Sequence, residues 1–377
     1  MTNRAGAGTS LVLLSLGIRC AFLSVILLAA RVPIDVFFSQ SDAGSYLTVA
    51  NWIWSGNRPD GFASSYHARV FLGWPLIFGW TTLLGLGKPG LILSALLFAC
   101  LVPLCFYGMS RDASLSLLLC YFTPAWLLHS INPMSEAAYL CFGLASTLLL
   151  TRGRELWAGL TIGVMIGVRP YGLALLLGQL LVLLRRGGSG MAARLAAYGV
   201  GAALFPLLCA AVNLRLYGDV LRQWRMYSGH LGALNIGAEA TALLGDPTGH
   251  LGWPFVSLVA TPLYVPTPLW KVAYVYAHVV LLLLLVVITA QRLVRRRDMS
   301  EVDVCMATWF LLNAALIVCG GPYWGFHAFD RYFVWAWPAG LWLARDRLRL
   351  SRRAHLALAA ASVMMVAFSV GRYLVAH

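Results

Sequence analysis

Long apolar runs, each close to the length of a membrane span, recur along the whole 377-residue chain. Hydrophobic residues make up 60% of the sequence and charged residues only 11%, which is typical of a polytopic membrane protein. In lipid, the backbone satisfies its hydrogen bonds either in helices or in a closed barrel. The apolar runs are continuous and do not alternate with polar residues, which excludes a barrel. The sequence therefore predicts an all-α polytopic membrane protein.

About 11 transmembrane helices are expected, in a single integral-membrane domain that covers residues 1–377. The first apolar run continues past Arg19 to Ala30, so we expect an uncleaved span rather than a signal peptide. The apolar segments considered as spans are 11–30, 70–87, 91–109, 113–130, 137–151, 156–184, 195–214, 269–290, 304–320, 332–344 and 355–371.

The net charge of +14 comes from arginines that cluster between the apolar runs. The positive-inside rule explains these clusters as cytoplasmic loops, so nucleic acid is not an expected partner. Arginine is used almost to the exclusion of lysine, which indicates a GC-rich bacterial genome. We therefore expect a multi-pass protein of the plasma (inner) membrane with a cytoplasmic N-terminus. The basic clusters are Arg111; Arg152 and Arg154; Arg185, Arg186 and Arg194; 292–297; and 345–353.

The first outer segment, residues 31–90, must begin and end outside if all the basic clusters lie inside. Residues 70–87 are then an interfacial or re-entrant helix, which suits their glycines, proline and tryptophans. The alternative is a full span at 70–87, which would place Asp42 and Glu136 on opposite faces. The favoured topology puts four polar stretches on the outer face: 31–69, 131–136, the large segment 215–268, and 321–331.

Residues 156–184 are expected to form a hairpin of two short helices that turns at Arg169 and Pro170. Proline breaks the backbone ladder, and arginine is costly in lipid. The helix before the turn rises only about 20 Å, so Arg169 should lie inside a polar cavity. A phosphate would satisfy this arginine. A proline-kinked helix with a snorkelling arginine, or an ion pair with Asp42 or Glu136, stays open as an alternative.

Two acids and a tyrosine on the outer face are candidates for chemistry. Asp42 follows the first span and is placed to act as a general base on a substrate hydroxyl, with Tyr46 on the same helical face. Glu136 opens a helix after a short turn, close to the membrane surface. Ordinary roles stay open: a helix cap or loop acid for Asp42, and a helix-dipole contact for Glu136.

Two histidine–arginine pairs lie in the same outer segments. His327 and Arg331 are spaced i, i+4 and can share one helical face amid aromatic residues, which suits a sugar-phosphate. His67 and Arg69 lead into 70–87 and are candidates to bind a phosphate headgroup. For both pairs, an interfacial anchor in an aromatic belt stays open as the alternative.

The acids, the embedded arginine and the histidine–arginine pairs share one face, which predicts an enzyme acting on an anionic, membrane-borne substrate. The 8 cysteines lie in or beside apolar runs without a C-x-x-C, as buried hydrophobes rather than metal ligands. No Walker loop, H-E-x-x-H or G-x-S-x-G occurs in the sequence. The sequence therefore lacks the motifs that nucleotide-driven transport and zinc proteolysis require.

Six stretches carry a resemblance to a known family, in this order: "SDAGSYLTVANWIWSG", "GWPLIFGW", "NPMSEAAYL", "GLTIGVMIGVRPYGL", "PLLCAAVNLRLYGD" and "FDRYFVWAWPAGLWLA". Together with the arginine-bearing first span, they resemble the integral-membrane glycosyltransferases of the GT-C fold. That family includes bacterial lipid-A sugar transferases and the protein, dolichol-linked and GPI mannosyltransferases. The resemblance spans most of the chain.

The resemblance implies a hexosyltransferase that takes its sugar from a polyprenyl-phosphate donor, with inversion at the sugar carbon. It also implies that Asp42 is the catalytic base of the first outer loop. The other family positions map to Glu136, Arg169, Arg331, Tyr332 and Pro338. The family's first loop carries an acidic pair where this chain has Asp42 alone. A divalent metal (Mg or Mn) on Asp42 and Glu136 therefore stays an open question.

Two other functions stay open. The same outer groups would suit a lipid-linked glycan flippase or a secondary transporter, although the sequence contains no apparent inverted repeat. A non-catalytic scaffold of the same fold is the third possibility. The partners expected of the enzyme are a polyprenyl-phosphate sugar and a lipid, glycan or protein acceptor, with the active site on the extracytoplasmic face.

Overall fold

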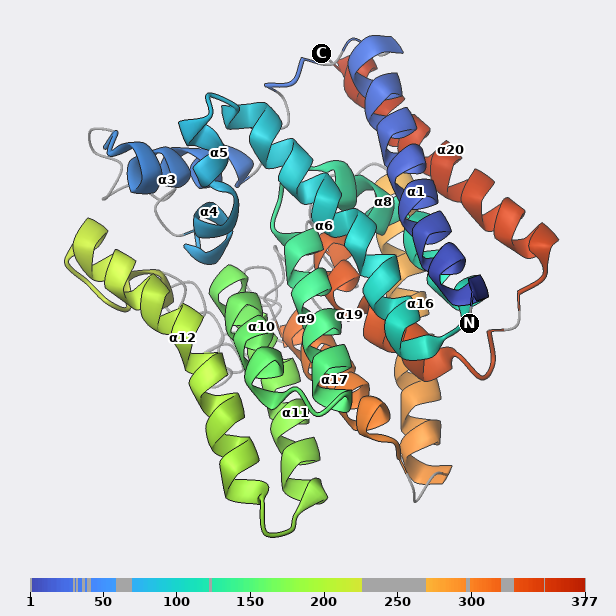
Figure 1. The fold of residues 1–377 in the computed structure, drawn as a ribbon. Coiled ribbons are helices and arrows are strands. Elements are labelled where there is room, and N and C mark those ends of the chain that lie inside the picture. The colour runs from blue at the N-terminus through green and yellow to red at the C-terminus, as the bar shows by residue number, and fades with distance from the viewer. Residues whose placement is uncertain are drawn as a thin grey trace, which may run out of the picture.

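The computed structural model describes residues 2–29, 31, 33–35, 38, 42–58, 70–121, 124–225, 269–295, 299–319, 329–348 and 350–376. Every regular element within these ranges is a helix, as the sequence predicts (Figure 1). The described α-helices are α1 (Thr2–Ser24), α3 (Ala43–Ser55), α4 (Gly73–Phe78), α5 (Trp80–Leu83), α6 (Gly87–Ser110), α7 (Ala113–Tyr121), α8 (Pro124–Ile131), α9 (Glu136–Thr151), α10 (Glu155–Val168), α11 (Leu173–Arg186), α12 (Met191–Tyr217), α16 (Leu269–Arg295), α17 (Glu301–Cys319), α19 (Phe329–Ala344) and α20 (Arg352–Ala376).

Four of the described helices are long and apolar enough to cross a membrane: Gly6–Leu28, Gly87–Ser110, Met191–Tyr217 and Val272–Val294. A fifth span results if α7 and α8, which meet at an angle of 69°, are one broken span. Helices α9 and α10 are apolar but shorter, with 16 and 14 residues. The all-helical class is therefore confirmed for the described residues, and their apolar helices are consistent with a multi-pass membrane protein, whereas the total of about 11 spans stays a prediction.

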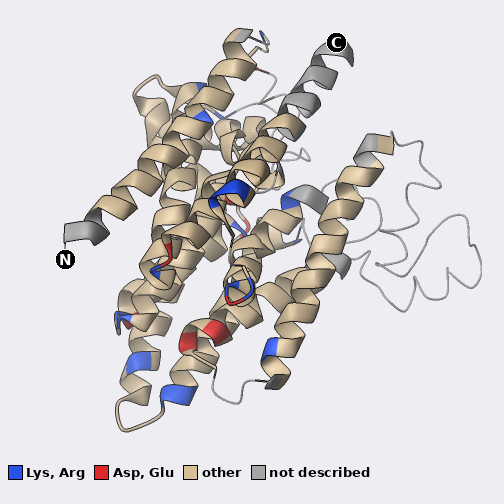
Figure 2. Ribbon diagram, turned by 90° about the vertical axis from the view of Figure 1, so that its right-hand side faces the viewer, with Lys and Arg blue, Asp and Glu red and all other residues tan. Residues whose placement is uncertain are grey.

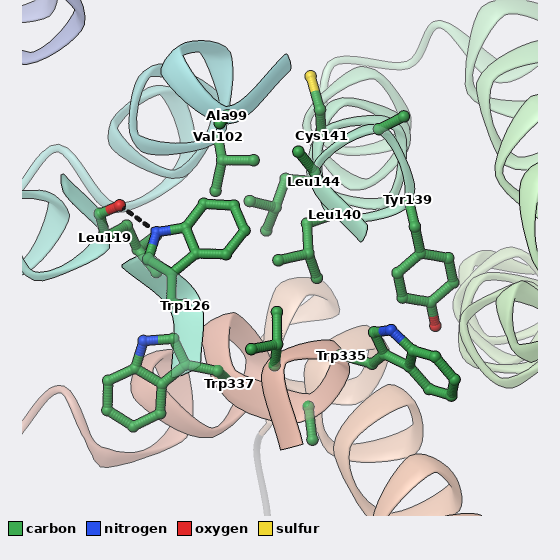
Figure 3. Packing of buried hydrophobic residues seen from close by; sticks show 14 of the residues in the cluster. Ala99, Val102, Leu119, Trp126, Tyr139, Leu140, Cys141, Leu144, Trp335 and Trp337 are labelled. Atoms are coloured by element: carbon green, nitrogen blue, oxygen red, sulfur yellow. Dashed lines mark hydrogen bonds between the residues drawn. The ribbon is translucent and has the colours of Figure 1, made fainter. Parts of the chain in front are cut away.

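The long helices form two layers. Successive contacts join α12, α10, α9, α6 and α1 in one layer, and they join α11, α17, α19 and α16 in the other (Figure 1). Helix α9 contacts α17 and α19 across the layers. The core lies between them, where Trp126 of α8 donates to the Leu119 carbonyl oxygen at 2.5 Å and Trp335 of α19 lies against Tyr139 of α9 (Figure 3).

Residues 70–87 do not form a straight span. They contain α4, of 6 residues, and α5, of 4 residues, separated by Gly79. At about 1.5 Å per residue, neither helix approaches the ~30 Å thickness of a hydrocarbon core. Helix α4 packs closely on α10, because a Cβ at Gly73 would lie 2.2 Å from the Gly167 carbonyl carbon. This result does not support one continuous span at 70–87, whereas the interfacial or re-entrant position of the segment stays a prediction.

Residues 156–184 are broken where the sequence predicts a turn. Helix α10 ends at Val168, Arg169 is extended (φ −152°, ψ 129°), and a 3-10 turn at Pro170–Gly172 leads into α11. The extended backbone follows from Pro170, which disfavours the helical conformation of the residue before it. At the far end of α11, Arg186 donates to Glu155 Oε1 at 3.1 Å. Helix α11 thus returns to the start of α10, and the pair is a hairpin rather than one kinked helix.

A glycine stripe on α10 holds this helix against α12. Gly159 and Gly163 are four residues apart, and a Cβ at these positions would lie 2.1 Å from Tyr198 O and 2.6 Å from Ala202 O. Small residues spaced four apart let two helices approach closely. In lipid, close van der Waals packing stabilises helix association, because the hydrophobic effect does not act between helices there. The stretch "GLTIGVMIG" therefore has a structural role, which we did not predict from the sequence.

Arg19 is fully buried in the first candidate span, at the break between α7 and α8. Its guanidinium donates to Ser130 Oγ at 2.9 Å and to the Cys120 carbonyl oxygen at 3.1 Å, and it lies 5.2 Å from the Trp126 ring centroid. Carbonyl groups in the last turn of a helix lack intrahelical partners. Arg19 therefore satisfies a helix end inside an apolar environment.

Charged residues of both signs lie toward the end of the bundle that holds the connection between α11 and α12 (Figure 2). There Arg186 pairs with Glu155 and with Glu301, while Arg194 donates to the Gly187 carbonyl oxygen. Glu136 lies at the other end of α9, about 24 Å away along a helix of 16 residues. Basic residues are not confined to the end with the α11–α12 connection, because Arg215 lies in the last turn of α12 and Arg222 and Arg225 follow it.

Candidate functional site

Four charged side chains from four distant segments meet at one place, which we call the acid–arginine cluster: Asp42, Glu136, Arg169 and Arg331. Arg331 Nη2 lies 3.1 Å from Asp42 Oδ2, and Arg331 Nε donates to Glu136 Oε1. Arg169 Nη2 lies 2.8 Å from the same oxygen of Glu136. Arg331 therefore bridges the two acids, and Glu136 holds both arginines.

Local structure explains how each group is presented. Asp42 precedes α3 at the N-cap position, but its side chain makes no capping hydrogen bond and contacts Arg331 instead. Glu136 is the first residue of α9, where the positive end of the helix dipole favours a carboxylate. Arg169 lies in the turn of the hairpin, and Arg331 lies in the first turn of α19. Of the alternatives weighed for Arg169, the ion pair with Glu136 is the one observed.

Exposure differs across the acid–arginine cluster. The side chains of Glu136 and Arg169 are 0% and 5% exposed, whereas those of Arg331 and Asp42 are 18% and 24% exposed. Burial opposes the ionisation of Glu136, but the charges of Arg169 and Arg331 outweigh it and hold the pKa of this carboxyl below its usual value. Glu136 is thus a buried anion held by two arginines, and Asp42 is the more exposed of the two acids.

Ser135 and Tyr46 support the buried side of the acid–arginine cluster. Ser135 Oγ accepts from Arg169 Nε at 2.8 Å and shares a hydrogen bond of 3.1 Å with Tyr46 Oη. Burial raises the pKa of Tyr46 to about 12, so the phenol stays neutral at neutral pH. The sequence predicted Tyr46 as a neighbour of Asp42. It left Ser135 as a helix start, although its position beside Glu136 was a usable signal.

Aromatic rings form one wall of the site. The Arg169 guanidinium lies 4.8 Å from the Trp335 ring centroid, a cation–π contact. Tyr171 and Tyr332 lie 4.4 Å and 4.7 Å from the same ring. Trp335 had no assigned role in the sequence interpretation. Its i, i+4 spacing from Arg331 on α19 was the signal that pointed to it.

Some predicted site residues cannot be compared with the structure. His67, Arg69 and His327 lie outside the described residues. The predicted pairing of His327 with Arg331 therefore stays a prediction. Arg331 itself contacts Asp42 and Glu136, which argues against its alternative role as a lipid-headgroup anchor.

The donor set does not fit a metal site in this arrangement. Among the described residues, no group of three or more His, Cys, Asp or Glu side chains is placed to hold a metal ion. The two acids proposed for Mg or Mn, Asp42 and Glu136, both accept hydrogen bonds from Arg331. A cation between them would have to displace the guanidinium, so we derive no step through a metal.

Two cavities lie away from the acid–arginine cluster. One of about 530 Å³ is lined by residues of α1, α6 and α9 that include Arg111 and Arg152. The other, of about 580 Å³, is lined by residues that include Asp112 and Arg345. Both are lined by residues at the end of α6.

Comparisons with known proteins leave the family open. No protein-family model matches the chain, and no curated protein matches it. A functional assignment therefore rests on the geometry. That geometry offers a partly exposed carboxylate, two guanidinium groups for an anion, and aromatic surface beside them.

Proposed function

We propose that the chain is a membrane glycosyltransferase of the GT-C type, with about 11 spans. In this proposal it moves a sugar from a polyprenyl-phosphate donor to an acceptor hydroxyl on the extracytoplasmic face, with inversion. The observation that carries the proposal is the acid–arginine cluster, which combines a partly exposed carboxylate, Asp42, with two arginines suited to a phosphate. The positive-inside rule supports the orientation, since the basic loops lie at the other end of α9.

Asp42 is the proposed catalytic base. The acceptor oxygen attacks the sugar C1 while its proton passes to the Asp42 carboxylate, and the bond from C1 to the phosphate oxygen breaks. In the resting arrangement Arg331 Nη2 lies 3.1 Å from Asp42 Oδ2 and occupies that carboxylate oxygen. A donor phosphate competes for the same guanidinium. Donor binding would therefore draw Arg331 toward the phosphate and leave Asp42 able to accept the proton.

The arginines are proposed to receive the charge of the leaving lipid phosphate. Phosphate is a good leaving group, so no additional acid is required. Arg169 is already ordered by Glu136, Ser135 and the face of Trp335. Preorganised donors stabilise developing charge without a cost of reorganisation during the reaction. Arg169 is thus the fixed element of the phosphate site, and Arg331 is the movable one.

Glu136 is proposed to position the two arginines and not to contact the donor. Its side chain is 0% exposed, and its Oε1 accepts from both Arg169 and Arg331.

The decisive experiment is Asp42→Asn, assayed by mass spectrometry with a polyprenyl-phosphate hexose and a membrane extract as the acceptor source. The variant should lose sugar transfer, while it stays folded and still binds the donor lipid. Asp35→Asn is the matched control, because Asp35 lies in the same outer segment and pairs with Lys88 at 2.6 Å on the surface. Full turnover by Asp42→Asn would refute the assignment of the base.

The buried charges also suit a flippase or secondary transporter, which carry ionisable groups in the membrane. Proteoliposomes that contain the wild-type protein and the donor lipid separate the two classes. An enzyme forms a sugar-bearing product when the acceptor is present. A flippase moves the donor lipid from one leaflet to the other without forming any product. That result would refute the enzyme proposal in favour of a flippase.

A further inference from the structure

A groove of about 530 Å³ lies at the far end of α9 from the acid–arginine cluster. One face of α6 forms its floor, with Leu104 and Gly108, and Val12 of α1 and Leu148 of α9 line its two sides. This arrangement follows from α6 lying between α1 and α9 (Figure 1). The volume falls within the roughly 300–1,000 Å³ of small-molecule sites. The groove is therefore large enough for part of a ligand.

Glycines let the three helices that form the groove approach one another closely. A Cβ at Gly108 would lie 2.8 Å from Leu148 Cδ2, and one at Gly8 would lie 3.0 Å from Leu104 Cδ1. Larger side chains at either position would enter the space. The floor and walls are otherwise mainly apolar, which suits a hydrocarbon chain.

Two arginines line the groove where α6 and α9 end. Arg111 follows the last residue of α6, and Arg152 follows the last residue of α9. Both are exposed, and within the ranges that the structure describes neither guanidinium has a recorded partner. The adjacent acid, Asp112, accepts instead from the Leu115 backbone N–H at 3.0 Å at the start of α7. The groove thus carries two positive charges that no described acid neutralises.

The groove adjoins the surface that would face lipid. Leu13, next to Val12 on α1, is 61% exposed, and Leu97, two turns before Leu104 on α6, is 58% exposed. Both helices are candidate membrane spans. A ligand that enters from the bilayer can therefore place its hydrocarbon in the groove and its headgroup near the two arginines.

We propose that this groove binds an acidic glycerophospholipid. Its phosphate would lie against Arg111 and Arg152, and one acyl chain would lie along Leu104 and Val12. Charge complementarity commits the site to an anionic lipid, and the positive-inside rule puts the groove in the cytoplasmic leaflet, which carries the acidic lipids. The site is about 24 Å along α9 from the acid–arginine cluster, so it does not depend on the proposed function.

The test is native mass spectrometry of the full chain in detergent, titrated with phosphatidylglycerol and, separately, with phosphatidylcholine. The wild-type protein should bind phosphatidylglycerol more tightly than phosphatidylcholine. The variant Arg111→Gln/Arg152→Gln should bind it about 30-fold more weakly, the factor that corresponds to about 1 kcal/mol per arginine. Arg154→Gln/Arg185→Gln is the matched control, because it removes the same charge from the same end outside the groove and should bind as the wild type does.

Two further arms identify the ligand and the groove. Gly108→Leu, which leaves both arginines in place, should weaken phosphatidylglycerol binding by filling the floor. Inorganic phosphate at the same concentrations should not displace the lipid. Equal binding by the wild type and Arg111→Gln/Arg152→Gln, equal weakening in the control variant, or displacement by inorganic phosphate would each overturn the proposal.

Discussion

Replacing Glu136 by glutamine removes a carboxylate that both Arg169 and Arg331 contact, with little change in side-chain size. The side chains of Glu136 and Arg169 are 0% and 5% exposed, so the arginines lose a counter-charge where water cannot replace it. Removing one partner of a buried ion pair costs about 3–5 kcal/mol. At about 2 °C per kcal/mol for a large domain, the melting temperature should fall by roughly 6–10 °C.

The assay is thermal unfolding of the purified protein in detergent, followed by the fluorescence of its buried tryptophans. Glu155→Gln is the matched control: Glu155 pairs with Arg186 at 3.1 Å, but its side chain is 15% exposed and Arg186 keeps Glu301. Such a partly exposed pair contributes about 1 kcal/mol or less to the free energy of unfolding. The melting temperature of the control variant should therefore fall by no more than about 2 °C.

A double variant tests the origin of the loss. Glu136→Gln/Arg169→Gln removes both partners of the most buried pair, so it should be more stable than Glu136→Gln alone. If Glu136→Gln melted no lower than the control, or if the double variant were the less stable one, the acid–arginine cluster would not hold these segments together. This prediction concerns stability and does not depend on the proposed enzyme activity.

Two further predictions concern packing and pH. Gly159→Val should lower the melting temperature, because its Cβ would lie 2.1 Å from the Tyr198 carbonyl oxygen, whereas Gly199→Val on α12 meets nothing within 4 Å and is the control. Burial opposes the ionisation of Asp303, but hydrogen bonds led by that from Arg345 outweigh it and lower the pKa to about 2. The stability from this lowered pKa is present above the unfolded value of about 3.9 and is lost as the pH falls through about 2. The stability difference between the wild type and Asp303→Asn should therefore narrow over that range.

Each of these two predictions has a clear contrary outcome. Equal melting of Gly159→Val and Gly199→Val would contradict the close approach of α10 and α12. A difference between the wild type and Asp303→Asn that stays constant from about pH 4 to about pH 2 would contradict the ionised state of Asp303.

Several features could be predicted from the sequence because they depend on local chemistry. Membrane insertion follows from the length and continuity of apolar runs, whose transfer free energies add along the chain. The turn at Arg169 follows from Pro170, which cannot continue a helix with full hydrogen bonding. The arginine clusters predicted that residues 70–87 are not a simple span, because the charge bias acts on whole loops, and the structure divides these residues between two short helices.

Other features needed the tertiary structure, because they depend on how helices pack. Asp42 and Arg331 are separated by 289 positions and meet at 3.1 Å, and no local pattern pairs them. From the sequence, Arg169 could either bind a phosphate or form an ion pair with an acid. In the fold it lies 2.8 Å from Glu136 and forms the ion pair. Ser135 and Trp335 were missed because a serine before a helix and a tryptophan near a membrane surface usually serve as a cap and an anchor.

The sequence by itself determined the class of this protein: an all-helical membrane chain with arginine clusters between its apolar runs and polar segments that carry acids and arginines. The tertiary structure decided which of those charges meet. The physical reason is the range of each effect. Partitioning into lipid depends on local composition, whereas an ion pair at about 3 Å depends on the packing of helices from distant parts of the chain.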